Sequence, residues 1–437
     1  MLESTAKKTS NVDANKVAST DRAAHEWFRF VLSFPPHLVR DYLTRFGVAD
    51  DQRVLDPFCG TGTTLVEAKK MGLPSVGIES HPLTHFVSRT KVDWSPDPDG
   101  LVAHAEGIAE TALQAFAADG LADAPRLEGD EKGRDYRTLP PDSFKLLLTD
   151  SISPRPLHKT LVLIDALERT RDERYDAHLR LALAKTLVLT ISNLRFGPEV
   201  GIAPAKLDVA VVAPWMAAVR SIANDLGELG PITSTRSDVH RADARRMIDV
   251  LEPRSVGAVF TSPPYPNEKD YTRTTRLESV LLGFIRDRRE LQAVKRGLVR
   301  SNTRGVYKGD ADDAWITEHP EIQRIADEIE ARRLELGKTS GFERLYGRVT
   351  KLYFGGMARH LADLRPILRP GAYLAYVVGD QASYLRVMIR TGHILADIGE
   401  HLGYEVVGID LFRTRLATAT RAQLNEEAVV LRWPGAR

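Results

Sequence analysis

The sequence predicts an α/β fold built on a mostly parallel, seven-stranded sheet in which the last strand is antiparallel. Short apolar runs alternate with helical patterns, which is typical of parallel strands connected by covering helices. A glycine-rich turn joins the first apolar run to the first helical pattern. The last two runs are separated by too few residues for a covering helix, so we expect them to pair antiparallel.

Seven apolar runs account for the strands. The first two, residues 53–58 and 75–80, flank a helical pattern that ends at Gly72. A second helical pattern, "GGMARHLADLRPIL", precedes the fifth run. The five later runs are residues 237–243, 256–260, 372–380, 404–412 and 427–433.

Two long segments interrupt this alternation. Residues 101–235 are mostly helical in pattern, and residues 286–345 are charge-rich, with an exposed helix expected in "IQRIADEIEARRLELG". The polar first residues favour a mobile segment. We therefore expect a flexible tail (1–24), a core (25–100 and 236–437), a mostly helical insertion (101–235) and a basic, charged insertion (286–345).

Composition excludes several classes of protein. With 437 residues, 43% of them apolar and 27% charged, the chain suits one large domain with insertions or two domains. No apolar run approaches the roughly 20 residues that cross a bilayer, and the N-terminus has no signal-peptide core, so we expect a cytoplasmic protein. The single cysteine, Cys59, excludes a disulfide framework and a cysteine-built metal site. We expect no metal, and the net charge of +1 neither suggests nor excludes a polyanionic partner.

The glycine turn "DPFCGTGTT" carries the first chemical signal. Gly60 and Gly62 lie between a strand and a helix, where positive φ and free N–H groups let the backbone approach a ligand. Glu79 lies at the end of the next strand, the position at which nucleoside-binding α/β folds carry an acid that hydrogen bonds to ribose hydroxyls. The pattern is neither the dinucleotide GxGxxG nor a phosphate loop. The alternative is a structural turn with an incidental acid.

These residues together resemble the S-adenosylmethionine-dependent methyltransferases, and especially those that methylate exocyclic amino groups in DNA. The resemblance implies a Rossmann-like class I methyltransferase fold and S-adenosylmethionine as cofactor. It covers about half of the chain: residues 25–95, 236–285 and 350–433. The large helical insertion lies outside the minimal fold of that family. The cofactor-binding residues that the resemblance implies are Phe34, Pro35, Asp56, Phe58, Gly60, Gly62, Thr63, Glu79 and Asp243. A helix that packs on the sheet edge is the alternative for the first two, and a surface acid is the alternative for the last.

The stretch "TSPPY", after the strand "VGAVF", carries the second signal. An exocyclic amine is a poor nucleophile because its lone pair is delocalised into the ring. Ser262 Oγ and the Pro263 carbonyl can each accept one amine hydrogen, and Pro263 and Pro264 fix the turn. Tyr265 offers a face for a flipped-out base. A purely structural double-proline turn is the alternative.

The first residue of this motif bears on the base. The family pattern is Ser, Asp or Asn followed by Pro-Pro and an aromatic residue, and "TSPPY" most resembles the cytosine-N4 enzymes, whereas adenine-N6 enzymes more often carry Asp. Methylation at cytosine C5 needs a thiolate, and the only thiol lies in the glycine loop. We therefore predict a site-specific DNA methyltransferase, cytosine-N4 before adenine-N6, of a restriction–modification or related defence system. An RNA guanine-N2 methyltransferase and a non-enzymatic DNA-binding subunit are the alternatives.

A basic segment follows the motif. From Tyr271 to Gly309 there are ten Lys and Arg residues against three acids, which suits phosphate neutralisation. A solvated helix face is the alternative for each residue. Either insertion could hold the target-recognition region, and double-stranded DNA with base flipping is the expected partner. The DNA-binding candidates are Arg273, Arg276, Arg300, Arg304 and Lys308, with a second basic loop carrying Arg413, Arg415 and Arg421.

Overall fold

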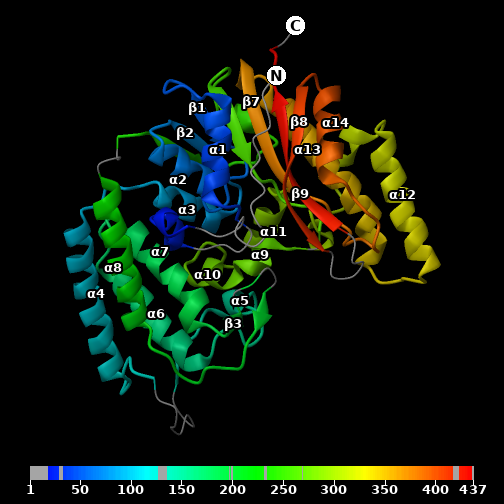
Figure 1. Cartoon of the computed structure of the whole chain (residues 1–437). Coiled ribbons are helices and arrows are strands. Elements are labelled where there is room, and N and C mark those ends of the chain that lie inside the picture. The colour runs from blue at the N-terminus through cyan, green and yellow to red at the C-terminus, as the bar shows by residue number, and fades with distance from the viewer. Residues whose placement is uncertain are drawn as a thin grey trace.

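The structure is a computed structural model that describes residues 18–28, 33–125, 135–195, 197, 200–230, 234–267, 269–416 and 423–435. Its centre is a seven-stranded sheet of order β5-β2-β1-β6-β7-β9-β8 (Figure 1). The strands are β1 (Arg53–Asp56), β2 (Ser75–Ile78), β5 (Ser237–His240), β6 (Val256–Thr261), β7 (Leu368–Gly379), β8 (Glu405–Leu416) and β9 (Gln423–Arg432).

The pairing of the strands confirms the predicted fold class. The strands β5, β2, β1, β6 and β7 run parallel to one another, and β9 runs antiparallel to both β7 and β8. All seven predicted runs contain a strand. The strand order reverses direction around β1 and β6, so the turns that follow these two strands open on one crevice.

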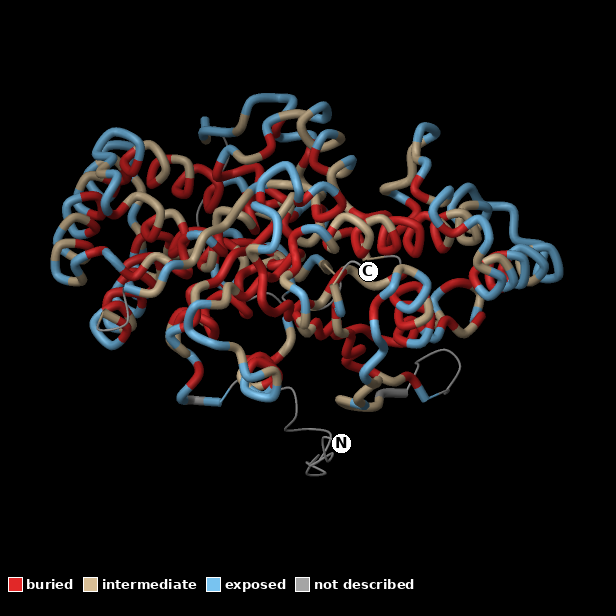
Figure 2. The backbone as a smooth tube through the Cα atoms, turned by 90° about the horizontal axis from the view of Figure 1, so that it is seen from above, coloured by how far each residue is buried: buried red, intermediate tan, exposed pale blue. Residues whose placement is uncertain are grey.

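Helices cover both faces because successive strand residues point to opposite sides. Val54 and Phe260 lie in the core beneath α1 (Pro36–Phe46) and α2 (Thr63–Lys70). Leu55 and Val259 lie in the opposite core, which α13 (Tyr346–Leu364) and α14 (Thr391–His401) cover. Each central strand is therefore buried on both faces, and Figure 2 shows this buried layer continuing through the molecule.

The mostly helical insertion packs against one end of the sheet (Figure 1). Its helices α4, α6, α7 and α8 share a hydrophobic core with α2, α3 and α10, so it is continuous with the body of the molecule. A short antiparallel pair also lies in it. The elements in and just before the insertion are α4 (Pro98–Ala118), α5 (Pro141–Phe144), α6 (Pro154–Arg169), α7 (Asp176–Thr186), β3 (Leu194–Arg195), β4 (Gly201–Ile202) and α8 (Val212–Leu229). The neighbouring helices outside it are α3 (Pro82–Lys91) and α10 (Arg276–Leu281).

The predicted flexible tail needs a correction at its end. Residues 1–17 lie outside the described residues, but residues 18–28 pack on the body of the protein. Ala24 is fully buried and donates its backbone N–H to Asp225, and the Trp27 indole N–H donates to the same carboxylate at 2.7 Å. Asp21 accepts a hydrogen bond from Arg40 on α1. These contacts tie the segment to both the sheet unit and the helical insertion.

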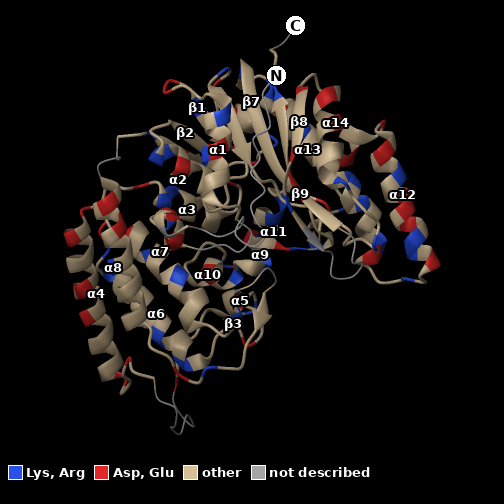
Figure 3. Cartoon of the chain, in the orientation of Figure 1, with Lys and Arg blue, Asp and Glu red and all other residues tan. Residues whose placement is uncertain are grey.

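The charged insertion (286–345) contains α11 (Arg288–Arg296), several short helices and α12 (Pro320–Glu335), and α9 (Tyr271–Thr274) lies before it in the sequence. α12 buries Ile322, Ile325 and Ile329 in the core that it shares with α13, so only its outer face is exposed. That face carries both charge signs (Figure 3). Arg324 pairs with two glutamates of the same helix, so the face does not present a uniformly basic surface.

No helix in the described ranges is both long and apolar enough to span a membrane.

Candidate functional site

A cavity of about 800 Å³ opens at the carboxyl ends of the central strands. The glycine loop after β1 and the "TSPPY" turn after β6 both line it, although some 200 residues separate them in the sequence. They meet because β1 and β6 are adjacent parallel strands, with Leu55 paired to Val259. The third wall comes from the charged insertion, through residues 295, 297–302 and 305.

The glycine loop has the backbone geometry that its sequence predicts. Gly60 and Gly62 have φ values of +50° and +88°, which other residues adopt only at a steric cost. A Cβ on Gly62 would lie 3.1 Å from the Ser88 side chain. The helix α2 begins at Thr63 without a side-chain cap, so the N–H groups of its first turn remain available to a ligand. Gly60 and Thr63 line the cavity, whereas Gly62 does not.

Asp56 holds this loop rather than lining the cavity. Its Oδ1 accepts hydrogen bonds from the Phe58 backbone N–H at 3.1 Å and the Thr261 hydroxyl at 2.6 Å. Its Oδ2 has no partner within the described part of the chain. Burial raises the pKa of Asp56 to about 6, and these hydrogen bonds oppose the rise. Asp56 thus joins the glycine loop to the end of β6, beside the "TSPPY" turn.

Glu79 lies on the cavity wall at the end of β2. Its Oε1 accepts the backbone N–H of His81 at 2.7 Å. Burial raises the pKa of Glu79 to about 7, against the lowering effect of hydrogen bonds from the backbone of His81 and Gly60. A carboxylate so placed, with acceptor capacity remaining, suits a ligand that brings hydroxyl donors.

Asp243 lines the cavity beside Glu79 because β5 and β2 are adjacent, with His240 paired to Ile78. Its side chain is 23% exposed. The Arg245 guanidinium donates to both of its oxygens. Sequence reasoning predicted the acid but not the arginine.

Two aromatic rings flank the glycine loop. Phe34 lines the cavity and packs edge-on against Phe260, with ring centroids 5.3 Å apart. The ring centroid of Phe58 lies 4.9 Å from that of His360, a buried side chain that hydrogen bonds to the Ala244 carbonyl. Pro35 precedes α1 and does not line the cavity.

In the "TSPPY" turn, the Ser262 hydroxyl donates to the Val377 carbonyl of β7 at 3.0 Å. Because its hydrogen is used there, the oxygen keeps its lone pairs for an incoming donor. Among the described residues, no backbone donor takes the Pro263 carbonyl. Ser262, Pro263 and Pro264 all line the cavity, so the turn offers two acceptors to a donor inside it.

Tyr265 lines the cavity beside these acceptors. Its ring packs against Gly379, where an added Cβ would lie 3.1 Å from Tyr265 Cε2. Gly379 therefore allows the ring to lie close against the end of β7. Burial raises the pKa of the Tyr265 phenol, and the nearby Glu426 raises it further, so the ring is neutral at physiological pH.

Cys59 points away from this turn. Its thiol donates to Ser88 at 3.7 Å and lies where a Cβ on Gly77 would approach within 2.8 Å. Burial raises the pKa of this thiol well above its usual value. The Cys59 thiol is thus protonated and in contact with Ser88.

The predicted DNA-binding residues divide into two groups. Arg273, Arg304 and Lys308 are exposed, so they stay candidates. The prediction that Arg300 contacts DNA needs a correction. This residue is 5% exposed, and it donates to Asp310 and to backbone carbonyls, including that of Lys295.

Arg276 needs the same correction. Its guanidinium is used by Thr272 and by the Leu146 carbonyl of the helical insertion. In the second basic loop, Arg413 pairs with Glu426, Arg421 lies outside the described residues, and the side chain of Arg415 is not described.

Some cavity residues were missed by sequence reasoning. Lys295 and Asp270 form an ion pair of 2.8 Å in the wall, with side chains 14% and 6% exposed. Asn302 donates to the Lys269 carbonyl, and its buried Oδ1 has no partner among the described residues. No local pattern joins an aspartate to a lysine 25 positions away, so only the fold reveals the pair.

Comparisons with known proteins find similarity to DNA methylases. A family profile described as DNA methylase, of the N6 and N4 type, matches residues 3–85. The Type II methyltransferase M.BsoBI of Geobacillus stearothermophilus is 25% identical over 443 residues, covering 95% of this chain and 85% of that protein. The Type II methyltransferase M.AvaI of Anabaena variabilis is 23% identical over 429 residues, covering 92% and 83%.

Two further matches are more limited. The Type II methyltransferase M.MjaII of Methanocaldococcus jannaschii is 42% identical over 60 residues, which is 14% of this chain. Among solved structures, the rRNA methyltransferase aviRa of Streptomyces viridochromogenes aligns with a TM-score of 0.35 and 10% identity, covering 98% of this chain and 97% of that chain. A similarity this loose supports no conclusion about the substrate.

Proposed function

We propose that this amino-methyltransferase of the N4/N6 family transfers a methyl group from S-adenosylmethionine to cytosine N4 in double-stranded DNA. The observation that carries the proposal is the shared cavity of the glycine loop and the "TSPPY" turn. One wall suits a nucleoside-bearing ligand, and the other presents two hydrogen-bond acceptors to an amine. Adjacent parallel strands hold both walls in place.

The residues on the first wall fit S-adenosylmethionine, which when bound supplies an electrophilic methyl group. Glu79 would accept hydrogen bonds from the ribose hydroxyls, and Asp243 would accept a hydrogen bond from the adenine amino group. The backbone at Gly60 and Thr63 would face the methionine end, with Phe34 and Phe58 as apolar cover. Asp56 would position the loop. The positive φ of Gly60 and the uncapped start of α2 are the features that fit this ligand.

The second wall would act on the amine. Ser262 Oγ and the Pro263 carbonyl would each accept one amine hydrogen, which would aim the nitrogen lone pair into the cavity. Because Ser262 already donates to Val377, its oxygen is oriented before the substrate arrives. Pro263 and Pro264 have fixed φ values, so the turn needs little reordering. Holding both reactants in one geometry supplies much of the rate acceleration.

Tyr265 would stack on the target base. A base inside a duplex cannot reach this cavity, so it must leave the stack, and an aromatic face offsets part of that cost. The ring is already held against Gly379. Exposed Arg273, Arg304 and Lys308 would contact the phosphates around the flipped nucleotide.

The serine in the motif favours cytosine over adenine, and adenine N6 is the alternative base. The names of the similar Type II methyltransferases support a role in restriction and modification, which would place the enzyme in the cytoplasm with its DNA. An RNA guanine-N2 methyltransferase is a further alternative, and a non-enzymatic DNA-binding subunit would bind DNA without turnover.

Transfer of tritium from labelled S-adenosylmethionine separates these functions. Duplex DNA of mixed sequence and a structured RNA would be offered at equal nucleotide concentration, with the slow Ser262→Ala variant as the control. We expect label in DNA, and none above that control in RNA. Label in RNA alone would replace the proposal with the RNA alternative, and tight DNA binding without any label would favour the non-enzymatic one.

A further inference from the structure

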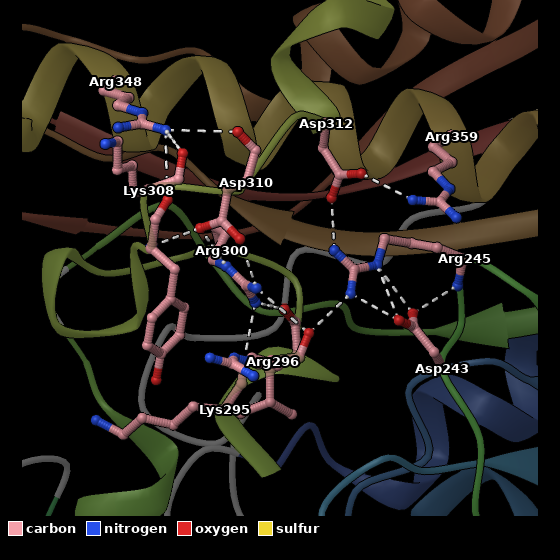
Figure 4. Close-up of polar contacts among 12 residues, drawn as sticks. Asp243, Arg245, Lys295, Arg296, Arg300, Lys308, Asp310, Asp312, Arg348 and Arg359 are labelled. Carbon is pink, nitrogen blue, oxygen red and sulfur yellow. Dashed lines mark hydrogen bonds and ion pairs between the residues drawn. The ribbon is translucent and has the colours of Figure 1, made fainter. Parts of the chain in front are cut away.

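Arg245 holds the cavity acid Asp243 through its whole guanidinium edge (Figure 4). Nε donates to Oδ1 at 2.9 Å and to Oδ2 at 3.2 Å, and Nη2 donates to Oδ2 at 2.6 Å. The backbone N–H of Arg245 donates to Oδ1 as well, at 2.9 Å. This two-point geometry fixes the plane of the carboxylate, which a single donor cannot do.

The same contacts determine which acceptor position remains open. A carboxylate has about four lone-pair positions. Oδ1 accepts both Nε and the backbone N–H, so its positions are filled. Nε has one hydrogen, which lies closer to Oδ1 (2.9 Å) than to Oδ2 (3.2 Å). Counted once, on Oδ1, it leaves Oδ2 with Nη2 as its main donor and with one acceptor position. Asp243 lines the cavity and its side chain is partly exposed, so we assign the open Oδ2 position to a ligand donor.

The other side of Arg245 is anchored in the charged insertion. Nη1 donates to Asp312 Oδ2 at 2.5 Å, and Nη2 also reaches the Arg296 carbonyl at 3.3 Å. The second oxygen of Asp312 accepts from Arg359 of α13 at 3.1 Å. Arg245 is 7% exposed and Asp312 is 8% exposed, so water screens this chain of charges weakly. Figure 4 shows the chain of charges from Asp243 through Arg245 and Asp312 to Arg359.

Two glycines of α13 make room for this anchor. A Cβ on Gly355 would lie 2.0 Å from the Asp312 carbonyl oxygen, and a Cβ on Gly356 would lie 3.3 Å from Val299. The segment with Asp312 therefore sits directly on the helix backbone. In the same segment, Arg300 donates to both oxygens of Asp310. The anchor for Arg245 is thus rigid at both ends.

We propose that Arg245 is a positioning residue that aims the open Oδ2 acceptor of Asp243 at the amino group of the cofactor's purine, with Asp312 fixing Arg245 from behind. The inference rests on the proposed function, because it takes Asp243 as a cofactor acceptor. It goes further in assigning purine selectivity to a side chain outside both sequence motifs. Without the Arg245 guanidinium, the backbone N–H to Oδ1 is the remaining donor among the described residues, so the carboxylate can turn about that contact and Oδ2 loses its fixed direction.

Two product-like ligands test this selectivity. S-adenosylhomocysteine carries the amino group, and S-inosylhomocysteine carries an oxygen at the same position, which Asp243 cannot accept from. Isothermal titration gives a dissociation constant for each. A charge-assisted hydrogen bond predicts that the native enzyme favours the adenosyl ligand by about 10- to 100-fold. In Arg245→Met and Arg245→Lys we expect that ratio to fall to within about threefold of unity.

A neighbouring arginine provides the matched control. Arg246 is exposed and pairs only with Asp249 in the described structure, so Arg246→Met should keep the native ratio. Asp312→Asn preserves the shape of the anchor but weakens its charge, and should lower the ratio partway. Reversible unfolding of an Arg245 variant would raise both dissociation constants by the same factor, so it leaves their ratio unchanged. The KM for S-adenosylmethionine should rise in these variants while kcat changes little.

The outcomes separate the inference from the proposed function. A native-like ratio in both Arg245 variants would overturn the inference, and so would a native enzyme that binds both ligands equally. In either case the proposed function stands, because the adenosyl ligand still binds. Failure of the native enzyme to bind either ligand would overturn the proposed function and the inference with it.

Discussion

Replacing Ser262 by alanine removes one of the two acceptors that face the amine. One preorganised hydrogen-bonding group of this kind contributes about 10²- to 10³-fold to turnover, so kcat should fall by that factor. The substitution also removes the 3.0 Å hydrogen bond to Val377, which costs about 1 kcal/mol of folding free energy. Among the described residues, the glycine loop and Glu79 form no hydrogen bond with this hydroxyl. The dissociation constant of S-adenosylhomocysteine should therefore change less than about threefold, or about 0.7 kcal/mol.

The assay is single-turnover methyl transfer to DNA at saturating cofactor, with cofactor binding measured by calorimetry on the same preparations. Ser255→Ala is the matched control, because the Ser255 hydroxyl donates to the Glu252 carbonyl at 2.6 Å, just before the opposite end of β6. That variant should keep the native rate. A less than tenfold loss of rate in Ser262→Ala would refute the acceptor role. Loss of cofactor binding in that variant would show that the "TSPPY" turn contacts the cofactor and not the target amine.

Three further predictions concern the cofactor, the insertion and DNA. Because burial raises the pKa of Glu79 to about 7 and ribose binding needs the carboxylate, S-adenosylhomocysteine affinity should rise from pH 6 to 8; calorimetry showing the same slope in Glu79→Gln would contradict this. Gly355→Ala should lower the unfolding free energy in urea by about 1–3 kcal/mol, whereas Gly107→Ala, with open space around it, should raise it by about 0.5–1 kcal/mol. Arg273→Ala and Lys308→Ala should each reduce the salt slope of DNA affinity by about 1, measured by anisotropy; unchanged slopes would remove these residues from the interface.

The sheet was predictable because it depends on local patterns. Continuous apolar runs such as "VGAVF" are typical of strands buried on both faces, and β6 is such a strand. The spacing between the last two runs predicted their antiparallel pairing, which is confirmed. The family resemblance is confirmed as well, by the DNA methylase profile and the similar Type II methyltransferases.

The remaining features depend on contacts between distant segments. The N-terminal residues up to Ala24 read as a polar tail, but Asp225 on α8 and Arg40 on α1 hold their end in place. Arg300 counts as basic in the sequence, yet Asp310 takes its charge inside the fold. A count of charges does not distinguish an exposed arginine from a buried one.

The cavity shows the same limit. The motifs predicted which turns face the ligand, because strand, turn and helix follow one another locally. They did not predict Arg245, Lys295 or Asn302, since each acts through a partner on another segment. Glycine 355 belongs to a run that reads as an ordinary helix, and only the approach of residue 312 explains its lack of a side chain.

The central claim is that this cavity methylates the exocyclic amine of cytosine in DNA. Mass spectrometry of nucleosides from duplex DNA incubated with the enzyme and S-adenosylmethionine tests it most directly, because it names the base and the position together. We expect N4-methyldeoxycytidine, formed about 10²- to 10³-fold more slowly when Ser262→Ala replaces the native enzyme. N6-methyldeoxyadenosine would contradict the choice of base, and 5-methyldeoxycytidine would contradict the amine mechanism itself.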